Sequence, residues 1–142
     1  MLPNHFISAE EQAELQLFTE SLERFCDAEI EPHYRTWEKA GRVPRERLRK
    51  MGETGYPSAD VPDTYGGPGA SVPFSFAVVE VLSRRGYGGF VGGLQVHNDI
   101  IPPYLLHCGT EAQRQYWLPR MASGDAIAAI GMTEPGAGSD LK

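Results

Sequence analysis

Apolar residues recur at intervals of three and four near the start of the chain, within an otherwise polar stretch. The repeating positions are Leu15, Phe18, Leu22, Phe25 and Cys26. This spacing predicts a helix with one apolar stripe. Ser8, followed three residues later by Glu11, is typical of a helix start, and Pro32 predicts that the helix ends near residue 31.

A short helix, a long loop and a very apolar helix are predicted next. Pro44 favours the first position of a helix, and the glycines that follow predict its end. Residues 56–72 are rich in proline and glycine, which predicts a long loop. Residues 74–82 are apolar on nearly every side, so we expect a helix buried within a bundle, with Ser71 as its cap.

Two further helices are predicted before the chain becomes extended. Residues 90–107 form the first, interrupted by a Pro-Pro pair. Thr110 opens the second with a capping box, and this helix is expected to stop before Pro119. Residues 126–132 are small or branched and apolar, which predicts a short strand or a buried extended segment. The predicted fold class is therefore mostly α.

Length and charge exclude several classes of protein. The chain has 142 residues and a formal net charge of -6, whereas a nucleic-acid surface needs a concentrated basic patch. Its one basic cluster, Arg45, Arg47, Arg49 and Lys50, predicts a solvated helix face. No apolar run approaches the roughly 20 residues that span a bilayer. The first residues do not resemble a leader sequence, so a cytoplasmic location is expected.

Cysteine and histidine usage predicts no metal site. Cys26 and Cys108 are distant in sequence and lack Cys-x-x-Cys spacing, so we expect two buried, reduced thiols. The histidines at positions 5, 33, 97 and 107 do not have the spacing of a metal-ligand set. For His97 we expect an interior or surface histidine with satisfied hydrogen bonds.

The loop after the extended segment carries the most chemistry. Thr133 and Ser139 supply hydroxyls, while Gly136 and Gly138 permit positive φ and the close approach of another molecule. Free backbone N–H groups beside such hydroxyls suit a phosphate or the polar edge of a ring. The loop lacks the Gly-Lys-Ser/Thr of a Walker loop, and Leu141 stands where a dinucleotide fingerprint needs its third glycine. A glycine-rich turn that only joins two elements is the alternative.

Four motifs occur in order along the chain. Residues 61–69 read Val-Pro-Asp-Thr-Tyr-Gly-Gly-Pro-Gly, and residues 80–84 read Glu-Val-Leu-Ser-Arg. Residues 109–119 begin Gly-Thr-Glu-Ala-Gln and end Tyr-Trp-Leu-Pro, and residues 133–140 read Thr-Glu-Pro-Gly-Ala-Gly-Ser-Asp. Together they resemble the acyl-CoA dehydrogenase family over nearly the whole chain. The resemblance implies that family's N-terminal helical domain at residues 1–124 and the start of its middle β-domain at residues 125–142.

In this family the last motif runs along FAD, so the resemblance implies a flavin-binding loop here. Thr133 would bond to the pyrimidine side of the flavin ring, and Ser139 would contact the FAD phosphates and lie near the acyl-CoA thioester. Glu134 is interpreted as a structural acceptor, because an acid beside a flavin that gains negative charge would oppose the reaction. The implied cofactor-binding residues are Ile130, Gly131, Met132, Thr133, Gly138 and Ser139, with Ser139 also the implied substrate-binding residue.

The resemblance further implies FAD-dependent α,β-dehydrogenation of acyl-CoA thioesters to trans-2-enoyl-CoA, and long-chain members look most similar. The family's general base is a glutamate of its C-terminal domain, so no catalytic residue is assigned here and the chain alone is expected to be inactive. Implied partners are acyl-CoA, an electron-transfer flavoprotein or similar acceptor, and further copies of the chain in a dimer or tetramer. The alternatives are another flavoenzyme of the superfamily, such as an acyl-CoA oxidase, and a non-enzymatic helical interaction module.

Overall fold

The first helix starts and ends where its sequence signals predict. In the computed structural model, which describes residues 7–139, the Ser8 side chain accepts a hydrogen bond from the backbone N–H of Glu11 at 3.1 Å. Helix α1 (Ala9–Phe25) follows and continues into a π-helical turn, η1 (Cys26–Ile30). The sequence observations on His5, Asp140 and Leu141 lie outside the described residues.

One of the next two helices was not predicted. Helix α3 (Arg45–Gly52) follows Pro44 as expected. Helix α2 (Tyr34–Ala40) has only seven residues, too few for a visible apolar repeat, and its Tyr34 and Trp37 are buried by neighbouring elements. Tyr34 packs against Tyr87 with ring centroids 4.5 Å apart. Tertiary contacts therefore stabilise this short helix more than its intrinsic propensity does.

Three of the four basic side chains predicted to form a solvated face on α3 take part in ion pairs. Arg47 and Lys50 both pair with Glu29 of η1, whose pKa is lowered by these two cations. Arg49 pairs with Asp125 at 2.8 Å. Arg47, Arg49 and Lys50 thus link α3 to neighbouring elements, which favours a structural role for these three side chains.

Helix α4 (Val72–Arg84) confirms the apolar helix but not its burial on every side. Phe76 is 56% exposed, while Val78 and Leu82 are fully buried. Ser71 is the N-cap residue of this helix, as expected, but its side chain makes no capping hydrogen bond, and its hydroxyl donates to Glu11 of α1. The loop before α4 is confirmed, with one short 3-10 turn, η2 (Asp63–Tyr65), inside it.

The predicted Pro-Pro interruption is not a break in the helix. Helix α5 (Gly88–Gln95), the π-helical turn η3 (Val96–Ile100) and helix α6 (Ile101–Cys108) run on from one another. The two prolines are the second and third residues of α6, directly after the π-helical turn, and the chain stays helical through them. Helix α7 (Glu111–Ala122) opens with the predicted capping box at Thr110. It continues past Pro119, so the expected stop before that residue was wrong.

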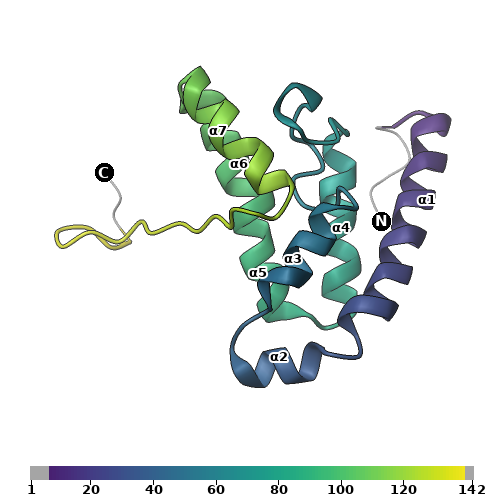
Figure 1. The fold of residues 1–142 in the computed structure, drawn as a ribbon. Coiled ribbons are helices and arrows are strands. Elements are labelled where there is room, and N and C mark those ends of the chain that lie inside the picture. The colour runs from purple at the N-terminus through teal and green to yellow at the C-terminus, as the bar shows by residue number, and fades with distance from the viewer. Residues whose placement is uncertain (1–6, 140–142) are drawn as a thin grey trace.

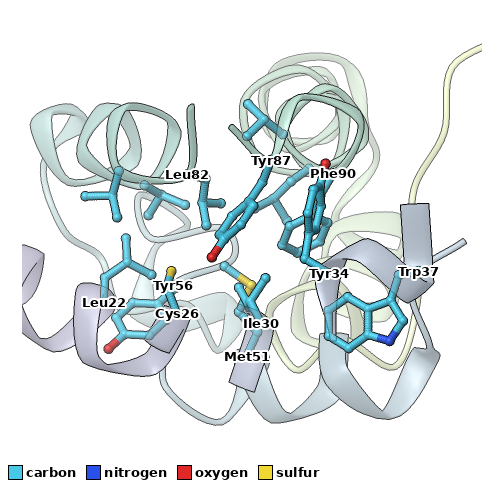
Figure 2. Packing of buried hydrophobic residues seen from close by; sticks show 14 residues of the cluster. Leu22, Cys26, Ile30, Tyr34, Trp37, Met51, Tyr56, Leu82, Tyr87 and Phe90 are labelled. Atoms are coloured by element: carbon cyan, nitrogen blue, oxygen red, sulfur yellow. The ribbon is translucent and has the colours of Figure 1, made fainter. Parts of the chain in front are cut away.

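The core lies between α1, α4 and α5, with α2 closing one end (Figure 1). Leu22, Cys26 and Leu82 lie toward one side of this core, and the rings of Tyr34, Tyr87 and Phe90 continue it toward Trp37 (Figure 2). Burial raises the pKa of the Cys26 thiol to about 11, so this cysteine is an inert, buried thiol as expected. Cys108 is exposed, which corrects the expectation that both thiols are buried.

The fold class is mostly α, as predicted. The predicted strand or buried segment at residues 126–132 is wrong for the part of the chain described: it forms no ladder, and its side chains are half-buried or exposed. Their exposure alternates between half-buried and exposed from Ala126 to Gly131, the period of a strand. Within residues 7–139, no helix is long and apolar enough to cross a membrane.

Candidate functional site

The candidate loop is carried on an extended segment whose base is firmly held. Ala126 donates its backbone N–H to the Arg120 carbonyl at 2.9 Å, and Asp125 pairs with Arg49. Just before them, Gly124 has φ +76 and lies so close to α3 that a Cβ there would be 2.5 Å from the Leu48 carbonyl oxygen. Contacts with helices α3 and α7 thus fix residues 124–126, the first residues of the segment.

His97 holds the same segment from η3. Its Nε2 lies 3.1 Å from the Met121 carbonyl oxygen, and the Ala128 backbone N–H points at its Nδ1 at 3.2 Å. The side chain is buried, and burial lowers the pKa of this imidazole. His97 is therefore an interior histidine with both ring nitrogens bonded, as expected.

Beyond Ala128 the segment leaves the helices and ends in a tight turn (Figure 1). Glu134 and Ala137 exchange two backbone hydrogen bonds, of 2.9 and 3.1 Å, across Pro135 and Gly136. The glycines that were expected to permit positive φ do not use it: Gly136 and Gly138 are absent from the positive-φ residues of the described chain. These two glycines instead leave open space beside the loop, because a Cβ on either would meet no atom within 4 Å.

All six implied cofactor-binding residues lie on this one segment. Ile130 is half-buried, and Gly131, Met132, Thr133, Gly138 and Ser139 are exposed. Within residues 7–139, those after Ala128 form hydrogen bonds only with one another. The loop thus presents two hydroxyls, free backbone and three open glycines to any molecule beside it.

A cavity of about 390 Å³ lies next to the base of the segment, between α2, α3 and α5. Aromatic rings of Tyr34, Trp37 and Phe90 form its walls, and Ile127 and Ala128 border it. Gly89 and Gly93 of α5 also line it, and a Cβ on either would meet no atom within 4 Å. The cavity therefore suits an apolar group, and these two glycines of α5 do not fill it.

Sequence reasoning missed both the cavity and the bond between His97 and Ala128. The only signal for the cavity was the spacing of the glycine pairs at 88–89 and 92–93, which places them one helical turn apart. Among the described residues, no three His, Cys, Asp or Glu side chains are grouped to hold a metal ion.

The structure is thus a helical domain followed by an extended segment that carries an exposed, glycine-rich loop. Comparison with known families gives its affiliation: residues 12–125 match the acyl-CoA dehydrogenase N-terminal domain. The chain belongs to the acyl-CoA dehydrogenase family. It is 40% identical over 131 residues to the mitochondrial long-chain specific acyl-CoA dehydrogenase of Sus scrofa, covering 92% of this chain and 30% of that one.

Solved structures share the fold. An acyl-CoA dehydrogenase from Geobacillus kaustophilus matches with a TM-score of 0.85 and 41% identity, over 96% of this chain and 34% of that one. An acyl-CoA dehydrogenase from Bacillus anthracis, in complex with FAD, matches with a TM-score of 0.83 and 32% identity, over 99% of this chain and 23% of that one. The chain thus spans about a third or less of the length of these relatives.

Proposed function

We propose that this chain is the helical domain and flavin-contacting loop of an FAD-dependent acyl-CoA dehydrogenase. The observation that carries the proposal is the loop of residues 133–139, which offers hydroxyls and open glycines away from the bundle. Residues 1–124 then form the helical domain, and residues 125–142 begin the domain that completes the site.

The open space beside Gly131, Gly136 and Gly138 fits a flat ring or a phosphate at van der Waals distance. Thr133 then donates a hydrogen bond to the pyrimidine side of the flavin, and Ser139 donates to an FAD phosphate. The backbone of residues 130–138 lines the ring edge. When bound, FAD supplies the acceptor for the hydride removed from the acyl-CoA.

Donors aimed at the pyrimidine side act where negative charge develops during hydride transfer, so they favour the reaction rather than binding alone. Glu134 contributes its backbone to the tight turn with Ala137, in keeping with a structural role. The α-proton is removed by a glutamate outside this chain, so no catalytic residue is assigned within it. An electron-transfer flavoprotein is the proposed electron acceptor, and dimers or tetramers the proposed assembly.

The proposed substrate is a long-chain acyl-CoA. The apolar cavity beside the base of the loop and the open glycines of α5 leave room for an apolar chain. Such a chain has no polar groups to satisfy, which matches walls of Trp37, Phe90 and Leu94. The 40% identity to a long-chain specific relative supports the same choice.

Flavin content and flavin reduction test the function in the whole protein that contains this chain. We expect a purified protein with a flavin absorbance band, and anaerobic palmitoyl-CoA should bleach that band with formation of the 2-enoyl-CoA. A protein that takes up FAD but reduces molecular oxygen at each turnover would be an oxidase instead. A colourless protein that binds no added FAD would favour the non-enzymatic interaction module and contradict the proposal.

Substitution of Gly93 tests the place of the acyl chain. Gly93→Phe puts a ring into the cavity without removing a contact, and phenylalanine is a better helix former than glycine. We expect kcat/KM to fall by about tenfold or more for palmitoyl-CoA and by less than about threefold for hexanoyl-CoA. Ala112→Phe, on the exposed part of α7, is the control. Equal losses for both substrates would show that the chain lies elsewhere.

A further inference from the structure

The hydrogen-bond partners of its two ring nitrogens hold His97 in a single neutral tautomer. The Met121 carbonyl oxygen, 3.1 Å from Nε2, can only accept a hydrogen bond, so Nε2 carries the proton. The Ala128 backbone N–H, 3.2 Å from Nδ1, can only donate, so Nδ1 must be unprotonated. The side chain is only 2% exposed, so bulk water has little access to either ring nitrogen. Its lowered pKa is consistent with this neutral form.

This neutral imidazole joins three parts of the fold. It belongs to the π-helical turn η3, it bonds to the end of α7 at Met121, and it holds the extended segment at Ala128. Thr133 is five residues further on, so it lies at most about 17 Å along the chain from this bond. In the part of the chain that the structure describes, no later residue of the segment bonds to the bundle.

The same turn holds a second loop. Asn98 is buried, and its Oδ1 accepts the backbone N–H of Ser58 at 3.2 Å. Ser58 has φ +53, a conformation that costs a residue other than glycine free energy and persists only when its surroundings enforce it. Two consecutive residues of a π turn thus each position one loop, and such turns often occur at functional sites.

We infer that His97 is a positioning residue, whose bond to Ala128 sets where the loop of residues 133–139 leaves the helical domain. The inference rests on the proposed flavin role of that loop. His97 also lines the cavity proposed for the acyl chain, but it acts on the loop through Ala128 and not through contact with the cofactor. By fixing Ala128, His97 gives the segment that carries Thr133 and Ser139 a defined starting position.

Two amide variants separate the roles of the two ring nitrogens. In His97→Asn, the side-chain oxygen takes the place of Nδ1 and still accepts from Ala128. In His97→Gln, the terminal amide takes the place of Nε2 and still donates to Met121, but Ala128 loses its acceptor. A role confined to filling the core predicts similar effects from both, whereas the inference predicts that only the glutamine variant releases the segment.

Amide exchange of the 142-residue chain, followed by NMR, tests the anchor directly. We expect Ala128 to exchange about tenfold faster in His97→Gln than in wild type and within about threefold of wild type in His97→Asn. The amide of Leu82, in the core, should stay protected in both variants. If either variant fails to fold, the protonation of the two ring nitrogens of wild-type His97, measured by NMR, tests the inference instead. A proton on Nδ1 would overturn the inference, and a proton on Nε2 alone is the expected result.

Flavin binding in the whole protein tests the consequence. His97→Gln should weaken FAD binding about tenfold and shift the flavin absorbance band, while His97→Asn should restore both. Faster Ala128 exchange with unchanged FAD affinity and flavin spectrum would overturn the positioning role. A wild-type protein that binds no FAD would instead refute the proposed function, and the exchange result would still decide whether His97 anchors the segment.

Discussion

Gly67→Ala is expected to lower the free energy of unfolding by about 3 kcal/mol. Gly67 lies in the Tyr-Gly-Gly-Pro-Gly turn, where a Cβ would be 2.1 Å from the Val61 carbonyl oxygen and 2.6 Å from the Val61 Cβ. Both of these atoms belong to a fully buried residue. The carbonyl already accepts from Gly69 N–H at 2.8 Å, so moving it away would break that bond.

Urea unfolding followed by helical circular dichroism measures this change, with an unchanged m value as the sign that the variant still folds in two states. Two other glycines serve as controls. Gly66→Ala keeps ordinary contacts but has φ +79, so it should cost only the backbone strain of about 1 kcal/mol. Gly88→Ala meets open space in a helix and should be neutral or slightly stabilising. A loss below 1 kcal/mol for Gly67→Ala would show that the turn can relax.

Local signals in the sequence predicted the helix starts better than the helix ends. Side-chain oxygens at Ser8 and Thr110 bond to nearby backbone N–H groups, and such short-range chemistry is visible in a sequence. Pro119 predicts a stop, yet the helix continues because Leu118 and Met121 are buried. Their burial offsets the hydrogen bond that proline cannot donate. Contacts made by residues distant in sequence thus overrode a local rule.

The extended segment also shows that a local pattern does not reveal contacts with distant residues. Its alternating exposure from Ala126 to Gly131 is that of a strand, but no strand pairs with it among the described residues. A strand needs a neighbour to satisfy its backbone, and a sequence pattern does not say where that neighbour lies. The pattern therefore gave the right backbone shape and the wrong burial.

For the candidate site, the sequence motif identified the loop residues but not the contacts that hold the loop in place. The family's loop motif places Thr133 and Ser139 on one short segment, which the structure describes up to Ser139. The anchor at His97 is 31 residues away from Ala128, and no spacing in the sequence connects the two. The apolar cavity depends on α2, which the sequence pattern did not predict at all.

Thr133→Val is expected to slow flavin reduction by one to two decades in the whole protein, with FAD content unchanged. Valine keeps the shape of threonine but removes the hydroxyl that is proposed to donate to the pyrimidine side of the flavin. If that donor is buried against the ring, its loss costs about 1–3 kcal/mol at the transition state. Anaerobic stopped-flow bleaching with palmitoyl-CoA measures the rate, and Thr36→Val, at an exposed position of α2, is the control.

Ser139→Ala is expected to have the opposite signature, because a phosphate contact serves ground and transition states alike. FAD occupancy after dialysis should fall, while the protein that retains FAD should bleach at nearly the wild-type rate. The two variants together thus assign one hydroxyl to chemistry and the other to binding. If both retain full FAD and bleach at the wild-type rate, the loop is only a glycine-rich turn, and the exposed hydroxyls of Thr133 and Ser139 have no flavin role.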